Sequence, residues 1–154
     1  MAENTTASGV EVLYDSWLRA WRTMDINLMV SLFDRDYGSL TYQAEEHERP
    51  STSYEQIVAY WKNAPSILER VSEWSEVEKT IALSGNCVTI FAILMTRLKA
   101  TFSPKEIAGK LRVSIVAHKK NDRWAIIHYH ESRQLLIEQK QGTWTLGADA
   151  KFLD

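Results

Sequence analysis

Two histidines and a glutamate follow one another closely in the segment Trp124–Ser132, whose sequence is Trp-Ala-Ile-Ile-His-Tyr-His-Glu-Ser. Side chains two residues apart share one face of a β-strand. A regular strand would therefore place His128 and His130 on the same face as Trp124 and Ile126, and Glu131 on the opposite face. Both faces mix apolar and polar groups, so we expect both to be covered, one by helices and one by another chain.

Glu131 is the predicted general base of the sequence. A carboxyl group among apolar side chains has a pKa raised toward neutrality, which suits it to proton transfer. Tyr129 lies on the same predicted face as Glu131 and is expected to contact the ligand. Tyr42 is the second predicted catalytic residue. The alternative is that Glu131 is a structural carboxylate paired with Arg97 or Arg112.

The histidines permit three interpretations. Two histidines at this spacing can reach one metal ion, but the sequence indicates no third ligand, so we predict no metal site. They could also be catalytic. The preferred interpretation is that His128 and His130 are structural or interface residues.

Two arginines could hold an anionic oxygen of a ligand. Arg97 interrupts an otherwise apolar strand segment, and Arg112 stands in the next one. A buried guanidinium needs a carboxylate or an anionic ligand. Either arginine would bind ligand if it pointed into the protein, and either could instead be a surface residue paired with an acid.

Aromatic residues could form a pocket for a flat apolar molecule. Tyr14, Trp17 and Trp21 share one helical stripe, and Tyr42 stands in a predicted strand. Core packing alone would explain the same stripe.

Composition favours one globular domain. The chain has 154 residues, 45% of them hydrophobic, and a net charge of −2, which argues against binding to nucleic acid or to a membrane surface. It has no phosphate-binding glycine loop, nucleophile elbow or zinc-protease motif, so we expect no cofactor. The N-terminus has no apolar signal segment, which favours the cytoplasm.

The helices are expected in the first part of the chain. Ser8 and Glu11 could form a capping box for a helix ending near Met24, with an apolar stripe at three- and four-residue steps. Asp25 would cap a second helix, and Thr52 or Ser53 a third that ends near Ala64, before Pro65.

Strands dominate the rest of the sequence. One is expected within residues 36–43, and longer ones at 71–83, 87–101, 109–119 and 123–132. This order predicts an α+β fold in which a curved sheet wraps the first helix. We divide the chain into a disordered N-terminus (1–8), one domain (9–132) and a C-terminal extension (133–154).

The order of elements and the last strand resemble the nuclear transport factor 2-like superfamily, in which a cone of sheet and helices encloses a pocket. The pattern Trp124-x-Ile126-x-His128-x-His130-x-Ser132 is most similar to the last strand of the association (hub) domain of calcium/calmodulin-dependent protein kinase type II, and SnoaL-like proteins have similar endings. The sequence departs from the hubs at Glu131, where they commonly have a basic residue, and at Arg133, where they have glycine.

The resemblance implies two functions. The first is a homodimeric SnoaL-like protein that binds a small hydrophobic or aromatic molecule, with a possible cofactor-independent isomerase, cyclase or dehydratase activity at Glu131. The second is a non-catalytic assembly module, a homodimer or larger ring, in which His128, His130 and the tail make subunit contacts.

Overall fold

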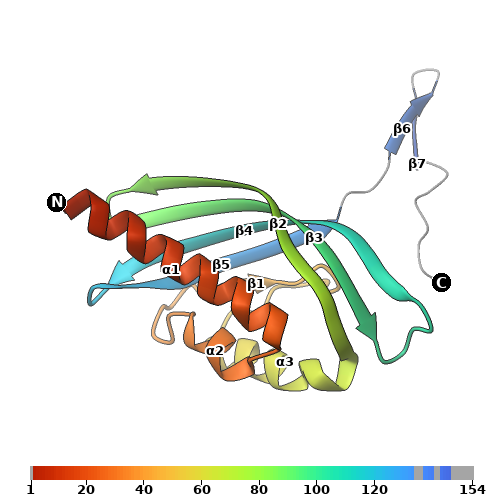
Figure 1. The fold of residues 1–154 in the computed structure, drawn as a ribbon, viewed down its shortest axis with the longest axis horizontal. Coiled ribbons are helices and arrows are strands. Elements are labelled where there is room, and N and C mark those ends of the chain that lie inside the picture. The colour runs from red at the N-terminus through yellow and green to blue at the C-terminus, as the bar shows by residue number, and fades with distance from the viewer. Residues whose placement is uncertain (1, 134–136, 141–142, 147–154) are drawn as a thin grey trace.

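The computed structural model describes residues 2–133, 137–140 and 143–146, and within them it confirms the α+β fold. Figure 1 shows a strongly curved sheet that bends around the long N-terminal helix, with two shorter helices below its end. The sheet has five strands in the order β1-β5-β4-β3-β2, with β1 and β2 as its edge strands, so it does not close into a barrel. In the described part of the chain, no helix is long and apolar enough to cross a membrane.

Helix α1 (Ala2–Thr23) carries the predicted apolar stripe on its buried face. It begins at Ala2, so the predicted start at Ser8 is wrong, and Ser8 and Glu11 lie inside the helix. Gly9 allows the helix to approach the sheet closely, because a Cβ atom there would lie 3.0 Å from Cδ1 of Trp124. The helix therefore lies directly against β5.

Helix α2 (Ile26–Ser31) begins as predicted, because the Asp25 side chain accepts a hydrogen bond from the backbone N–H of Leu28 at 2.9 Å. Strand β1 (Thr41–Gln43) is shorter than predicted, since the chain before it forms turns. It pairs with β5 in parallel, and this pairing places Tyr42 opposite Tyr129.

Helix α3 (Tyr54–Ile67) has Ser53 as its N-cap, which confirms one of the two predicted caps. The predicted end before Pro65 is wrong, because the helix continues through the proline to Ile67. Proline removes one N–H donor, but the N–H of Leu68 still bonds to the carbonyl of Ala64 and closes the last turn.

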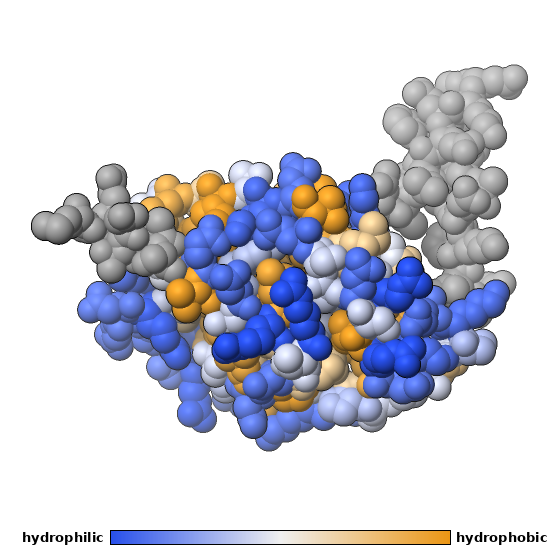
Figure 2. All heavy atoms as spheres, viewed as in Figure 1, coloured by the Kyte–Doolittle hydropathy of each residue, from blue (hydrophilic) through white to orange (hydrophobic). Residues whose placement is uncertain are grey.

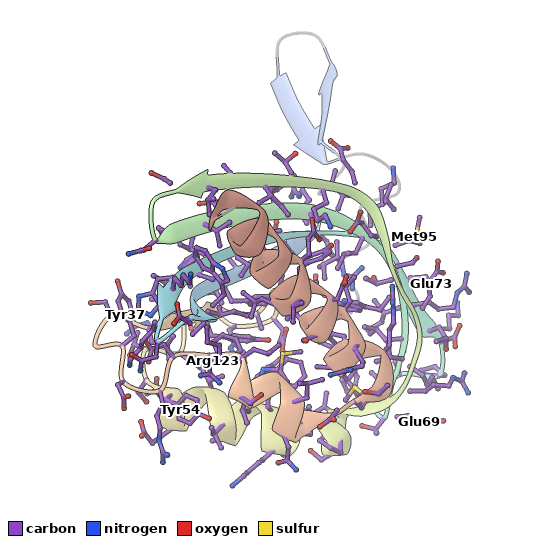
Figure 3. All side chains as sticks on the ribbon, turned by 60° about the vertical axis from the view of Figure 1, so that its left-hand side comes forward. Tyr37, Tyr54, Glu69, Glu73, Met95 and Arg123 are labelled. Carbon is purple, nitrogen blue, oxygen red and sulfur yellow. The ribbon has the colours of Figure 1, made fainter. Side chains whose placement is uncertain are left out.

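The long strands are β2 (Leu68–Ser84), β3 (Cys87–Ala100), β4 (Glu106–Lys120) and β5 (Arg123–Arg133), close to the predicted ranges. These four strands pair antiparallel with one another. Figure 3 shows Glu73 and Met95 on the outer side of the bend that β2 and β3 make around α1. The space-filling view in Figure 2 shows a mainly hydrophilic surface with separate groups of hydrophobic side chains.

A bulge in β5 corrects the predicted strand faces. His128 pairs with Val116 and Ile126 pairs with Ala117, so Ile127 has no partner on β4. The extra residue changes the alternation. Trp124 and Ile126 therefore point into the core, and so do Tyr129 and Glu131, whereas the prediction placed the two pairs on opposite faces.

Strands β6 (Ile137–Lys140) and β7 (Thr143–Leu146) pair with each other as a separate two-stranded sheet. The predicted division at residue 132 stays a prediction, although β5 itself continues through Arg133.

Candidate functional site

A cavity of about 890 Å³ lies between the inner face of the sheet and helices α1 and α3. Its walls are mainly apolar, its charged groups come from the end of β5 and from the loop after β1, and α3 adds the hydroxyl of Tyr60. The lining residues are Trp21, Glu45, Glu46, Tyr60, Ala64, Ile67, Leu68, Trp74, Leu98, Ala100, Phe102, Ile107, Leu111, Glu131 and Arg133. A volume of this size is typical of small-molecule sites.

Glu131 is the buried acid of this cavity, with only 4% of its surface exposed. Its Oε2 accepts a hydrogen bond from the Tyr129 hydroxyl at 2.5 Å, and the backbone N–H of Glu45 is 3.4 Å from Oε1. Burial raises the pKa of Glu131 to about 8, and the nearby Glu45 and Glu46 add to this increase, whereas the Tyr129 hydroxyl opposes it. The group can therefore exchange a proton near neutral pH.

Arg133 is a charged cavity residue that the sequence did not indicate, as are Glu45 and Glu46. Its Nε lies 2.8 Å from a carboxylate oxygen of Glu45, and its Nη1 donates to Oγ1 of the buried Thr96 at 3.1 Å. The strand spacing contained the signal, since Arg133 lies two residues after Glu131 and so on the same face. In the sequence it stands out only because related hubs have glycine at this position.

The predicted aromatic residues separate into a cavity wall and a core. Trp21 lines the cavity and stacks on Trp74 with ring centroids 4.0 Å apart. Tyr14 and Trp17 are fully buried and pack in the core, outside the cavity wall. The prediction that these two residues contact a ligand is therefore wrong as to their position.

Tyr42 also lies behind the cavity wall, stacked on Tyr129 with ring centroids 4.7 Å apart. It does not reach the cavity beside Glu131 as predicted, because the parallel pairing of β1 with β5 places its ring in the core. Tyr129 is the tyrosine that bonds to Glu131, and it too is completely buried rather than part of the lining.

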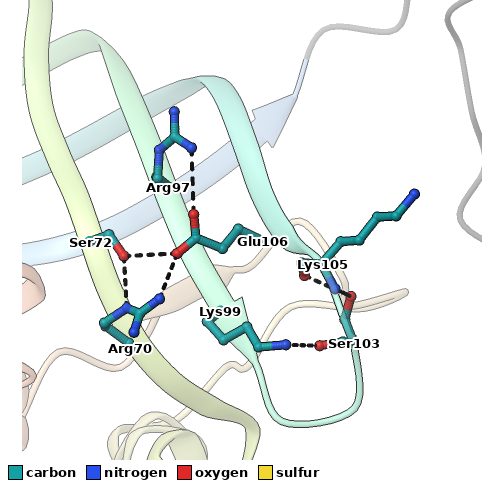
Figure 4. A network of polar contacts seen from close by, with 7 residues as sticks. All are labelled: Arg70, Ser72, Arg97, Lys99, Ser103, Lys105 and Glu106. Carbon is teal, nitrogen blue, oxygen red and sulfur yellow. Dashed lines mark hydrogen bonds and ion pairs between the residues drawn. The ribbon is translucent and has the colours of Figure 1, made fainter.

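Arg97 and Arg112 point away from the cavity. Both are exposed on the outer face of the sheet, because inward positions alternate with outward ones along β3 and β4. Figure 4 shows Arg97 with Glu106, whose carboxylate also binds Arg70. Arg112 donates to the backbone carbonyl of Arg133 at 2.9 Å. The prediction that either could bind ligand inside the cone is therefore wrong as to position.

His128 and His130 lie on the outer face as well. Nδ1 of His128 is 2.5 Å from Oγ1 of Thr41. Burial lowers the pKa of His128, and the nearby charge of His130 lowers it further. His130 is exposed. Among the residues that the structure describes, no group of three or more histidine, cysteine or acidic side chains is arranged to hold a metal ion.

Solved structures with this fold include proteins with different assigned roles. A candidate NTF2-like dehydratase from Streptomyces avermitilis has a TM-score of 0.70 and 12% identity, over 86% of this chain and 99% of that chain. A candidate calcium/calmodulin-dependent protein kinase II association domain from Xanthomonas campestris has a TM-score of 0.63 and 19% identity, over 81% and 85%. For a candidate aromatic ring hydroxylase from Novosphingobium aromaticivorans the values are 0.71 and 10%, over 97% of each chain.

These low identities establish a shared fold and not a shared activity. No curated protein matches the sequence significantly. A family model for the SnoaL-like domain matches residues 10–137. Since this match covers most of the chain, the protein belongs to the family of SnoaL-like domains.

Proposed function

We propose that the protein binds a small, mainly apolar molecule in its cavity and transfers a proton to or from it through Glu131. The reaction class would be a cofactor-independent isomerisation, cyclisation or dehydration. One observation carries the proposal: a buried carboxyl group with a pKa of about 8 lines a mainly apolar cavity of about 890 Å³. A carboxylate with a raised pKa is a stronger base than one in water and still ionises near neutral pH.

The proposed step needs no other reactant. The Glu131 carboxylate takes a proton from an acidic position of the ligand, the electron pair of the broken bond stays on the ligand, and the carboxylic acid returns the proton elsewhere. The stacked pair of Trp21 and Trp74 would form one aromatic wall against the ligand, and Phe102, which is 75% exposed, would border the entrance.

Deuterium exchange tests this proposal. We expect the protein to catalyse exchange of the α-hydrogens of 2-tetralone in D₂O, at a rate that increases with pH up to about 8, as Glu131 becomes the carboxylate. Glu131→Gln should reduce the rate about 10²- to 10⁴-fold, the usual contribution of a positioned general base. Mass spectrometry of the recovered ketone measures the exchange.

A pair of alanines provides the control. Ala64 on α3 lines the cavity, and Ala59 on the same helix is exposed. Ala64→Trp should fill the cavity and abolish exchange, whereas Ala59→Trp should leave it unchanged. Exchange that persists in both Glu131→Gln and Ala64→Trp would contradict catalysis in this cavity.

Self-association is the second candidate function, as a homodimer through the outer face of the sheet. Cross-strand pairing aligns Phe91, Ser114 and His130 in one row on this face. Phe91 is 38% exposed, and the half-buried Ile93 and Met95 extend the apolar surface along β3. Apolar side chains gathered on one sheet face support a protein contact, and association-domain proteins are among the structures with this fold.

Native mass spectrometry with light scattering tests the homodimer. We expect a dimer that Phe91→Arg converts to monomer, because an unpaired guanidinium would be buried at the contact. Phe102→Arg is the matched control, since Phe102 lies in the β3–β4 turn and away from that face. A wild-type monomer, or a Phe91→Arg dimer of unchanged affinity, would contradict the proposed interface.

A further inference from the structure

The polar end of the cavity has more carboxyl groups than basic groups. Glu45, Glu46 and Glu131 line it, and Arg133 is the sole basic residue among the described residues of the lining. Nε of Arg133 binds the Glu45 carboxylate at 2.8 Å, so these two charges balance each other. The cavity wall therefore supplies no cation for Glu46 or Glu131.

Glu131 makes this imbalance costly, because it is almost completely buried. Among the described residues, its carboxyl oxygens have two donors: the Tyr129 hydroxyl and the backbone N–H of Glu45, which is 3.4 Å away. Neither donor carries a positive charge. A buried carboxylate is stable when a cation or strong donors balance it, and otherwise it keeps its proton. A positively charged occupant would supply the missing balance.

Glu46 presents the accessible carboxylate at this end of the cavity. Its side chain is 54% exposed, and Oε1 accepts a hydrogen bond from the Tyr60 hydroxyl at 2.7 Å. Tyr60 also lines the cavity, so this bond holds the Glu46 carboxylate at the wall. Burial raises the pKa of Tyr60, and the charges of Glu46 and Glu131 raise it further. The wall around Tyr60 thus lies in the negative field of both carboxyl groups, and that field attracts a cation.

The rest of the wall favours an organic cation over a metal ion. No three histidine, cysteine or acidic side chains within the described part of the chain are arranged to hold a metal. The stacked rings of Trp21 and Trp74 form an aromatic wall, to which Tyr60 adds a third ring. Aromatic rings attract organic cations, and apolar walls hold a carbon skeleton. An anionic occupant would instead meet uncompensated carboxyl groups.

We propose that the cavity binds a mainly apolar amine in its protonated form, with the ammonium group beside Glu46 and Glu131 and the apolar part against the aromatic wall. The proposal rests on the proposed function and adds the charge and the chemical class of the occupant. A nearby cation favours the ionised form of a carboxyl group. Binding therefore displaces the proton of Glu131 and leaves this residue in the form that a general base requires.

Three naphthalenes of similar size separate charge from shape: 2-(aminomethyl)naphthalene, 2-ethylnaphthalene and 2-naphthoate. In the first two, an ammonium group replaces a methyl group. Equilibrium dialysis against the full chain at pH 8 measures their binding. We expect the amine to bind at least about tenfold more tightly than the hydrocarbon, and the carboxylate to bind most weakly. A factor of ten is about 1.4 kcal/mol, which is within the attraction of one partly buried ion pair.

Proton release is the second measurement. Glu131 has a pKa of about 8, so at pH 7 it has to lose its proton when an ammonium group binds beside it. Calorimetric titrations in two buffers of different ionisation enthalpy should show close to one proton released per amine at pH 7, and none per 2-ethylnaphthalene. The amine affinity should increase as pH rises toward 8, by at most about tenfold per pH unit. The other titratable or charged groups around Glu131 and Glu46 are Tyr42, Glu45, His47, Tyr60, Tyr129 and Arg133.

Two substitutions assign these effects. Glu46→Gln should lower the amine affinity about tenfold and leave hydrocarbon binding unchanged, and folding should persist because the side chain is largely exposed. Glu48→Gln is the matched control, since Glu48 is exposed in the same loop and outside the cavity lining, and it should keep the full preference. Glu131→Gln should abolish proton release.

The possible failures differ from one another. Equal binding of amine and hydrocarbon, or an amine preference unchanged in both Glu46→Gln and Glu131→Gln, would overturn the amine proposal and leave the apolar cavity proposal intact. Tightest binding of 2-naphthoate, or amine binding without proton release at pH 7, would also overturn it. If none of the three naphthalenes binds, the proposed function fails together with this inference.

Discussion

Asp34 and Glu131 are both 4% exposed, yet their carboxyl groups ionise in opposite ways. Asp34 follows α2 and lies near the end of β4. Its carboxylate accepts hydrogen bonds from Lys120 at 2.9 Å and from the backbone N–H of Asp36 at 3.0 Å, and it lies 2.6 Å from Nε2 of His118. Burial raises its pKa, but these bonds outweigh burial and lower the pKa to about 2. Glu131 has the Tyr129 hydroxyl and one long backbone contact, and its pKa rises to about 8.

The comparison indicates that burial raises the pKa of both carboxyl groups, and that the donors around each one decide whether the pKa stays raised. Asp34 is fixed as an anion and connects the loop after α2 to β4, which suits a structural role. Glu131 lacks a cationic partner within hydrogen-bonding distance among the described residues, so its proton is available for exchange.

The largest expected effect comes from Glu131→Gln measured against pH. The folded pKa lies above the unfolded value, so the native state binds the extra proton, and the wild-type free energy of unfolding falls as pH rises from about 4.5 to about 8. Glutamine does not titrate. The stability of the variant relative to the wild type should therefore increase by roughly 4 kcal/mol between pH 5 and pH 9.

Urea unfolding at both pH values measures this difference. Glu48→Gln is the matched control, because Glu48 is exposed in the loop after β1 and its substitution should give a nearly constant difference. Parallel stability profiles for the wild type and Glu131→Gln would show that Glu131 ionises normally in the folded protein.

A smaller effect is expected from Asp34→Asn, which should lower the free energy of unfolding by about 2 to 3 kcal/mol at pH 7, since Lys120 and His118 lose a buried anionic partner. The folded pKa of Asp34 is depressed, so its contribution is complete above about pH 4 and is lost as pH falls toward 2. The penalty should therefore shrink in acid.

Asp36→Asn is the control for this change, because Asp36 also contacts Lys120 but is 77% exposed. It should cost less than about 1 kcal/mol. If Asp34→Asn costs no more than Asp36→Asn, the structural role of Asp34 is wrong.

Tyr129→Phe should have the smallest effect. The hydroxyl stabilises the Glu131 carboxylate, so its loss should raise the pKa of Glu131 further, and removing one buried hydrogen bond should cost about 1 kcal/mol. Infrared spectroscopy measures this pKa. The band of the protonated Glu131 carboxyl group is assigned by its absence from Glu131→Gln, and its intensity is followed against pH. A lower pKa in Tyr129→Phe would contradict the idea that donors set the ionisation of this group.

The sequence was sufficient for the class of fold because the helical stripe of α1 and the alternation of β3 and β4 are local patterns. It also singled out Glu131, which stands after two histidines in the same strand, although its catalytic role stays a prediction. The sequence also contained enough to predict that Arg97 points outward. It alternates with Leu94, Thr96 and Leu98, which point inward. Only an explicit count of that alternation would have separated it from an inward arginine.

Other features depend on pairing that no local pattern specifies. Tyr42 belongs to the core because β1 lies beside β5 in parallel, and this neighbour is distant in sequence. The partner of Arg133 is Glu45, in a loop far from it in the chain. The sequence can therefore indicate the acid itself, but not which residues surround it in the cavity.

The unpaired Ile127 also affects how this chain can be compared with its relatives. If β5 kept Ile127 but alternated regularly without the bulge, either Trp124 with Ile126 or Tyr129 with Glu131 would face away from the helices. A relative whose last strand lacks the bulge would then be one residue out of step with this chain beyond Ile126. In a gap-free alignment, Glu131 would be compared with a residue on the opposite side of the sheet. Deciding which relatives possess an equivalent acid therefore requires structural superposition of this strand.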